Sequence, residues 1–124
     1  MFDFLLLLSA IIVVVIDSIY LSLVAPYFKY QVKLVQNSPM ELNYLGAVLS
    51  YVFIIAGLNY FIIKPRKSPQ DAFLLGIVIY GIFEATNLAL FKNWLFTTVI
   101  IDTLWGGILF ALTALIIEKI RRLL

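Results

Sequence analysis

Four long apolar runs, separated by short polar connections, constrain this chain more than any other feature. They cover residues 4–24, 44–63, 72–91 and 95–117. A helix needs about 20 apolar residues to cross the hydrocarbon core of a bilayer, so each run is long enough to span. The composition agrees, because 64% of the residues are hydrophobic and 13% are charged, whereas a soluble domain is about half apolar and about a quarter charged. The sequence predicts an all-α, multi-pass integral membrane protein, a four-helix bundle forming a single domain over residues 1–124.

Serine and proline mark where the predicted helices begin and end. Ser68 followed by Pro69 is typical of a helix start, and Ser38 followed by Pro39 has the same form ahead of the second run. Pro26 removes a backbone donor, so we expect the first helix to end there. Residues 27–36 then have the apolar spacing of a short interfacial helix, with an ordinary loop whose lysines extend to water as the alternative.

The basic residues predict how the bundle is oriented. Four spans place both termini on one side, together with the second connection. That side carries six basic residues: Lys64, Arg66, Lys67, Lys119, Arg121 and Arg122. The other side carries three: Lys29, Lys33 and Lys92. This asymmetry predicts that both termini face the cytoplasm. The formal net charge of +2 is too small to indicate a nucleic-acid partner.

Three acidic residues fall inside the apolar runs: Asp17, Glu84 and Asp102. At the rise of a helix, each lies about 10 Å from the same membrane boundary, and Asn87 is one turn from Glu84. A charged side chain at the bilayer centre costs about 2.5 to 3.5 kcal/mol on insertion scales. No lysine, arginine or histidine within the runs is available as a partner. The acids must therefore be protonated, bind a cation, face a wet cavity or accept hydrogen bonds.

We therefore predict one ion- or ligand-binding cluster made of Asp17, Glu84, Asn87 and Asp102. The segments Asp17-Ser18-Ile19-Tyr20 and Asp102-Thr103-Leu104-Trp105 share the order acid, hydroxyl, aliphatic, aromatic. Each helix would thus present a carboxylate and an aromatic donor one turn apart on one face. The side chains expected to support the cluster are Tyr20, Tyr80, Thr86, Thr103 and Trp105. The alternative is that the acids are neutral, hydrogen-bonded links between helices.

Small residues predict which helices approach closely. They recur every four residues at Gly81, Ala85 and Ala89 in the third run and at Thr103, Gly107 and Ala111 in the fourth. Such stripes let helix backbones approach each other in a membrane, and here they would bring Glu84 towards Asp102. Trp94 lies at the predicted boundary, where aromatic residues usually act as anchors.

The chain contains no cysteine and no histidine. Thiolate metal sites are therefore excluded, and the commonest metal ligand is missing. The sequence assigns neither catalytic residues nor a metal, and the ligand it points to is a proton or a cation held by the carboxylates.

The last third of the chain also carries a resemblance. The stretches YGIFEATNLALFKNW and DTLWG, with Asp17, Tyr20 and Leu21 in the first run, resemble a family of small four-span membrane proteins, domain of unknown function 2177, with members in bacteria and large DNA viruses. The resemblance covers nearly the whole chain. The family usually has Asp where Glu84 stands and Trp where Tyr20 stands. It implies four helices and a membrane location but supplies no activity.

Three functions remain open from the sequence. The first is a proton- or cation-linked carrier or small channel, which we favour and which predicts a homodimer or larger homo-oligomer in the lipid bilayer. The second is a membrane-embedded enzyme acting on lipid through paired carboxylates, or through magnesium bound to them. It lacks a phosphate-binding loop and a nucleophile paired with a base. The third is a structural or assembly protein whose polar core determines helix pairing.

Overall fold

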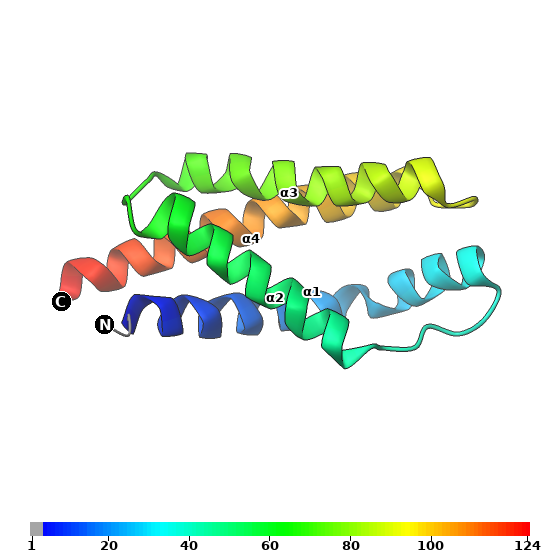
Figure 1. Cartoon of the computed structure of the whole chain (residues 1–124), viewed down its shortest axis with the longest axis horizontal. Coiled ribbons are helices and arrows are strands. Elements are labelled where there is room, and N and C mark those ends of the chain that lie inside the picture. Colours follow the sequence, from blue (N-terminus) through cyan, green and yellow to red (C-terminus); the bar gives the residue numbers. More distant parts are fainter. Residues whose placement is uncertain (1–3) are drawn as a thin grey trace.

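The computed structural model describes residues 4–124, and within that range the regular structure is helical throughout. The helices are α1 (Phe4–Gln36), α2 (Tyr44–Leu58), α3 (Pro69–Leu90) and α4 (Phe96–Leu123), and a π-helical turn, η1 (Asn59–Ile63), continues α2. Figure 1 shows the start of α1, the C-terminus and the α2–α3 connection at the same end of the molecule. The four helices are each long and apolar enough to cross a membrane, α2 being counted together with η1. The predicted four-helix membrane bundle is confirmed.

Apolar side chains cover the outside of the bundle, while the inside is unusually polar. Large residues such as Phe53, Tyr60 and Phe96 are exposed. Among residues 4–124, the buried set includes nine hydrophobic residues and eight polar or charged ones. Lipid tails are as apolar as leucine, so burial in a membrane provides little force for helix association, and close packing and hydrogen bonds between helices hold such a bundle together. The polar interior is therefore central to this fold.

The predicted start of α3 is confirmed, whereas that of α2 is wrong. The Ser68 side chain accepts a 3.1 Å hydrogen bond from the Asp71 backbone N–H, with Pro69 as the first helical residue. At α2 the cap is Asn43, which accepts a hydrogen bond from the Gly46 N–H. The segment at Ser38 stays outside a helix, where the Gln36 side-chain amide donates to two successive carbonyls in it.

The expectation that α1 ends at Pro26 is also wrong. The helix continues through Pro26 to Gln36, so residues 27–36 are helical but form one element with the first span. Proline is tolerated inside membrane helices because neighbouring groups and local adjustments satisfy the backbone group that it leaves unpaired.

Contacts with the α3–α4 turn hold the continuation of α1 in place. Gln31 is completely buried; its side-chain N–H donates to the Asn93 carbonyl at 3.1 Å, and its Oε1 accepts from the Leu95 N–H at 2.9 Å and from the Thr98 hydroxyl. The Tyr27 and Thr98 hydroxyls form a further hydrogen bond at 2.8 Å. The bond from the Leu95 N–H provides a partner for one backbone donor at the start of α4, which has no side-chain cap of its own. Together these bonds hold α1 against the turn.

The α3 and α4 backbones meet at glycines. A Cβ atom added to Gly76 would overlap the Gly106 carbonyl, and one added to Gly106 would overlap the Tyr80 ring. Gly81 lies against Thr103, as the stripes of small residues predict, but Ala85 and Ala89 of the same stripe are exposed. The closest approach therefore lies about one turn earlier on α3 than the stripe indicates.

We expect Gly76→Ala to destabilise the bundle. Overpacking of a close contact typically costs about 1 to 3 kcal/mol, and the atom that would be displaced belongs to the Gly106 backbone. The free energy of unfolding in mixed micelles measures the effect. Gly57→Ala is the matched control, because a Cβ there meets no heavy atom within 4 Å. Equal stability of the two variants would contradict the packing described here.

Candidate functional site

The two acid–aromatic segments identified in the sequence form hydrogen bonds across helices. The Trp105 indole N–H on α4 donates to Asp17 Oδ1 on α1 at 2.9 Å, and the Tyr20 hydroxyl on α1 approaches Asp102 Oδ1 on α4 at 3.5 Å. The Tyr20 and Trp105 rings stack between these bonds, with centroids 4.3 Å apart and planes within 4° of parallel. Each acid thus bonds to the aromatic residue of the other helix, and we call these four residues the crossed pair.

Asp17 has donors for both of its oxygens. Besides the Trp105 N–H on Oδ1, the Tyr51 hydroxyl from α2 donates to Oδ2. Asp17 is 7% exposed, so these bonds replace water almost entirely. This carboxyl group joins α1, α2 and α4, and its geometry suits a structural link.

Glu84 on α3 and Asp102 on α4 have a different environment. Glu84 is completely buried, and its Oε1 accepts a 2.8 Å hydrogen bond from the Trp94 indole N–H. Its Oε2 is buried without an N–H or O–H donor from residues 4–124, and the carboxyl group that Glu84 faces is that of Asp102. Two carboxyl groups can hydrogen-bond each other only when one of them carries a proton. We call Glu84 and Asp102 the acid pair.

Three other predicted site residues differ in burial: Asn87 and the Thr103 hydroxyl are buried, and Thr86 is exposed. Thr103 Oγ1 is buried without a hydrogen-bond partner in residues 4–124. Asn87 is buried one turn from Glu84, and its backbone carbonyl accepts a hydrogen bond from the Phe91 N–H. Thr86 is exposed, and its hydroxyl donates to the Ile82 carbonyl. Thr86 therefore lies outside the cluster.

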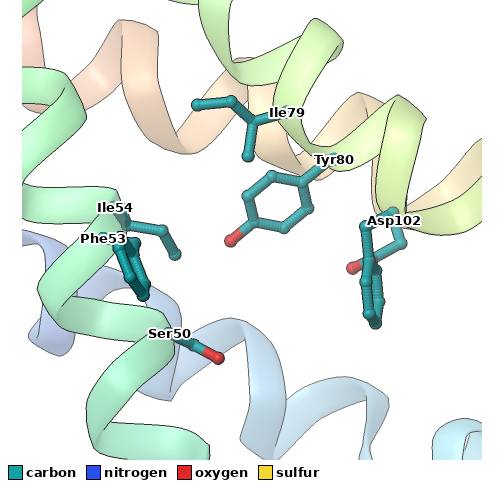
Figure 2. A pocket seen from close by; sticks show the side chains of 7 residues that line it. Ser50, Phe53, Ile54, Ile79, Tyr80 and Asp102 are labelled. Carbon is teal, nitrogen blue, oxygen red and sulfur yellow. The ribbon is translucent and has the colours of Figure 1, made fainter.

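A cavity of about 510 Å³ lies beside the acid pair, between α2 and the α3–α4 hairpin. Figure 2 shows the Tyr80 hydroxyl and the Asp102 carboxyl group projecting into this space, opposite Ser50 of α2. The lining residues are Ser50, Phe53, Ile54, Ile79, Tyr80, Phe83 and Asp102. Asp102 thus belongs both to the acid pair and to the cavity wall.

Basic side chains do not neutralise these acids. The ion pairs within residues 4–124 all use Glu118, with Arg66, Arg121 and Arg122 as partners. Glu118 is near the end of α4, where the C-terminus lies. Within the same residues, the structure contains no group of three or more acids suited to hold a metal ion. Within residues 4–124, the donors to the acid pair are therefore the Trp94 N–H and the Tyr20 hydroxyl, which are both uncharged groups.

Two residues of the network were not predicted as site residues from the sequence. We interpreted Trp94 as a boundary anchor, but the α3–α4 turn folds it back so that its N–H reaches Glu84. The only signal was its position ten residues after Glu84, across the turn. Tyr51 carried no signal beyond being aromatic, because its contact with Asp17 depends on how α2 crosses α1.

A double-mutant cycle can test the crossed pair. Trp105→Phe keeps a ring for stacking but removes the N–H, and Asp17→Ala removes the carboxyl oxygen that accepts from it. We expect the two changes to be coupled by about 0.6 kcal/mol, the average measured for hydrogen bonds between membrane helices, and by no more than about 1.7 kcal/mol, the maximum. The measurement is the free energy of unfolding in micelles. As the matched control, Trp105→Phe combined with Asp71→Ala, which alters an exposed acid at the start of α3, should be additive. Additivity in the Asp17 cycle would rule the bond out.

Comparisons with known proteins agree with the fold. Searches of curated proteins and of solved structures each gave no match. The model of one family, described as "Predicted membrane protein (DUF2177)", matches residues 3–117. Since this match covers nearly the whole sequence, and since the helices have the length and apolar composition of membrane spans, the chain belongs to the DUF2177 family of membrane proteins.

Proposed function

We propose that this protein is a proton- or cation-linked membrane carrier or small channel, with the acid pair as its exchange site. The observation that supports this most strongly is Glu84 Oε2, which is buried beside Asp102 and has no N–H or O–H donor within residues 4–124. A completely buried carboxylate without a compensating partner is costly. A proton or a cation between the two carboxyl groups would remove that cost.

Exchange follows from the charge balance of the pair. If both carboxyl groups were ionised at close range in a medium of low dielectric constant, each would destabilise the other. One proton shared by the two groups, or one monovalent cation bound in its place, lowers the negative charge to the same extent. Because both compensate the same negative charge, binding of the cation releases the proton, and binding of the proton releases the cation. Trp94 and Tyr20 would orient the two carboxyl groups through their hydrogen bonds.

Several titratable side chains surround the acid pair. Asp17 and Tyr20 come from α1 and Tyr80 comes from α3, and Tyr51 of α2 is hydrogen-bonded to Asp17. None of these is basic, so none can neutralise negative charge on the pair. The proton and the cation therefore compete in an environment that favours positive charge.

A structural role is the better assignment for Asp17. Both of its oxygens already accept hydrogen bonds from the protein, and the bonds connect three helices. We therefore treat Asp17 as a positioning residue that holds Tyr20, through the stacked Trp105, next to Asp102. The homo-oligomer and the cytoplasmic orientation of the termini remain predictions.

Infrared difference spectroscopy of the full chain in lipid nanodiscs tests the proton. A protonated carboxyl group in a dry site gives a distinct C=O stretching band. We expect such a band at low pH, and we expect it to disappear as the pH rises, because the pair then loses its shared proton. Glu84→Gln and Asp102→Asn should each change the band, since either removes one partner of the pair.

Asp71→Asn is the control, because Asp71 is an exposed acid outside the cluster. Its spectrum should match that of the unmodified protein. If no pH-dependent band responds to the changes at Glu84 and Asp102, the pair does not exchange protons and the proposed function is wrong.

A further inference from the structure

We infer that the cavity between α2 and α3 is a binding site for a lipophilic cation, a molecule with an apolar body and one positive charge, which enters sideways from the membrane. This inference rests on the proposed function and names the class of substrate that the acid pair would exchange for its proton. To that proposal it adds a binding site, a route by which the ligand enters, and the requirement that the ligand be positively charged.

The cavity has the size and lining of a site for a small organic molecule. Its volume of about 510 Å³ falls within the range of about 300 to 1,000 Å³ typical of ligand pockets. Most of its wall is apolar, made by Phe53 and Ile54 on α2 and by Ile79 and Phe83 on α3. Such a wall excludes strongly hydrated inorganic ions and favours an organic body.

The apolar rim indicates entry from the side. Phe53 is 73% exposed and Phe83 is 57% exposed, so the rings stand at the mouth of the cavity and not in the bundle core. They belong to the spanning parts of α2 and α3, where the surrounding solvent is lipid. A ligand dissolved in the bilayer could therefore reach Asp102 without crossing the bundle from either end.

The charge of the site selects the occupant. The polar wall is formed by Ser50, Tyr80 and Asp102, and among residues 4–124 no lysine or arginine lines the cavity. An acyl chain or another neutral occupant would fill the apolar part but would leave a proton as the only compensation for the acid pair. A cation balances Asp102 directly, and the rings at the rim attract positive charge through their faces. Charge complementarity thus favours a lipophilic cation over a neutral lipid or an anion.

Two probe ions of the same shape and opposite charge test this inference. Tetraphenylphosphonium and tetraphenylborate are added to the full chain in nanodiscs, with empty nanodiscs as reference, and binding is measured by calorimetry. We expect saturable binding of tetraphenylphosphonium alone. In weakly buffered solution, its binding should release about one proton per bound cation, since the two compete for the acid pair.

A variant that fills the cavity separates this inference from the proposed function. Ile79→Trp places bulk in the apolar wall but keeps both acids, so we expect tetraphenylphosphonium affinity to fall about tenfold or more, which corresponds to about 1.4 kcal/mol, while the carboxyl band remains. Ile82→Trp is the matched control on the same helix, because Ile82 is exposed and does not line the cavity. It should leave both measurements unchanged.

The outcomes are distinct. If the carboxyl band is present but tetraphenylphosphonium fails to bind, binds no better than tetraphenylborate, or binds equally well to Ile79→Trp, the cation site is wrong and the proposed function stands. If tetraphenylphosphonium binds with no release of protons, the cation site stands and the exchange is wrong.

Phe53→Cys tests for a second copy over the cavity, because the chain has no cysteine of its own. Efficient disulfide formation between copies in membranes would show the mouth closed by protein and would overturn lateral entry.

Discussion

A carboxyl group inside a bundle surrounded by lipid has to find its partners within the protein, and this constraint shapes the interior of the molecule. The ion pairs of residues 4–124 all use Glu118, far from the intramembrane acids. The donors to Asp17, Glu84 and Asp102 are instead indole N–H and phenol O–H groups. Aromatic side chains suit this role, because they present a large apolar body to hydrocarbon and a single polar atom to the acid.

Acids of similar chemistry occupy two different environments here. Each oxygen of Asp17 accepts a hydrogen bond, one from α2 and one from α4, so a ligand that displaced either donor would break a bond that holds helices together. Glu84 keeps one buried oxygen without a donor in the described chain, and it faces a second carboxyl group that borders a cavity. The Asp17 carboxyl group links helices, whereas Glu84 has an acceptor oxygen that a ligand could use. This contrast is the reason that we assign exchange to the acid pair and positioning to the crossed pair.

Around the site, α3 and α4 pack closely against each other, whereas a cavity separates α2 from them. Glycines let the α3 and α4 backbones touch, which fixes where Glu84 and Asp102 sit relative to each other. The α2 helix crosses the bundle obliquely, as Figure 1 shows, and it borders the cavity that reaches Asp102. Rigid placement of the acids, together with an opening beside them, is what a binding site for a mobile ligand needs.

The sequence by itself determined that the chain folds in a membrane and how many spans it has, because both depend on the length of the apolar runs. It also determined that Asp17, Glu84 and Asp102 need partners, because charge in lipid is costly. The α3 cap at Ser68 followed from the local serine–proline pattern. The tertiary structure alone decided that α1 passes through Pro26, since contacts made by Gln31 with a distant turn stabilise that continuation. It also decided that Trp105 bonds Asp17 and that Trp94 bonds Glu84. Hydrogen-bond partners on different helices depend on how each helix is rotated and where the helices cross, and that geometry arises only when all four pack together.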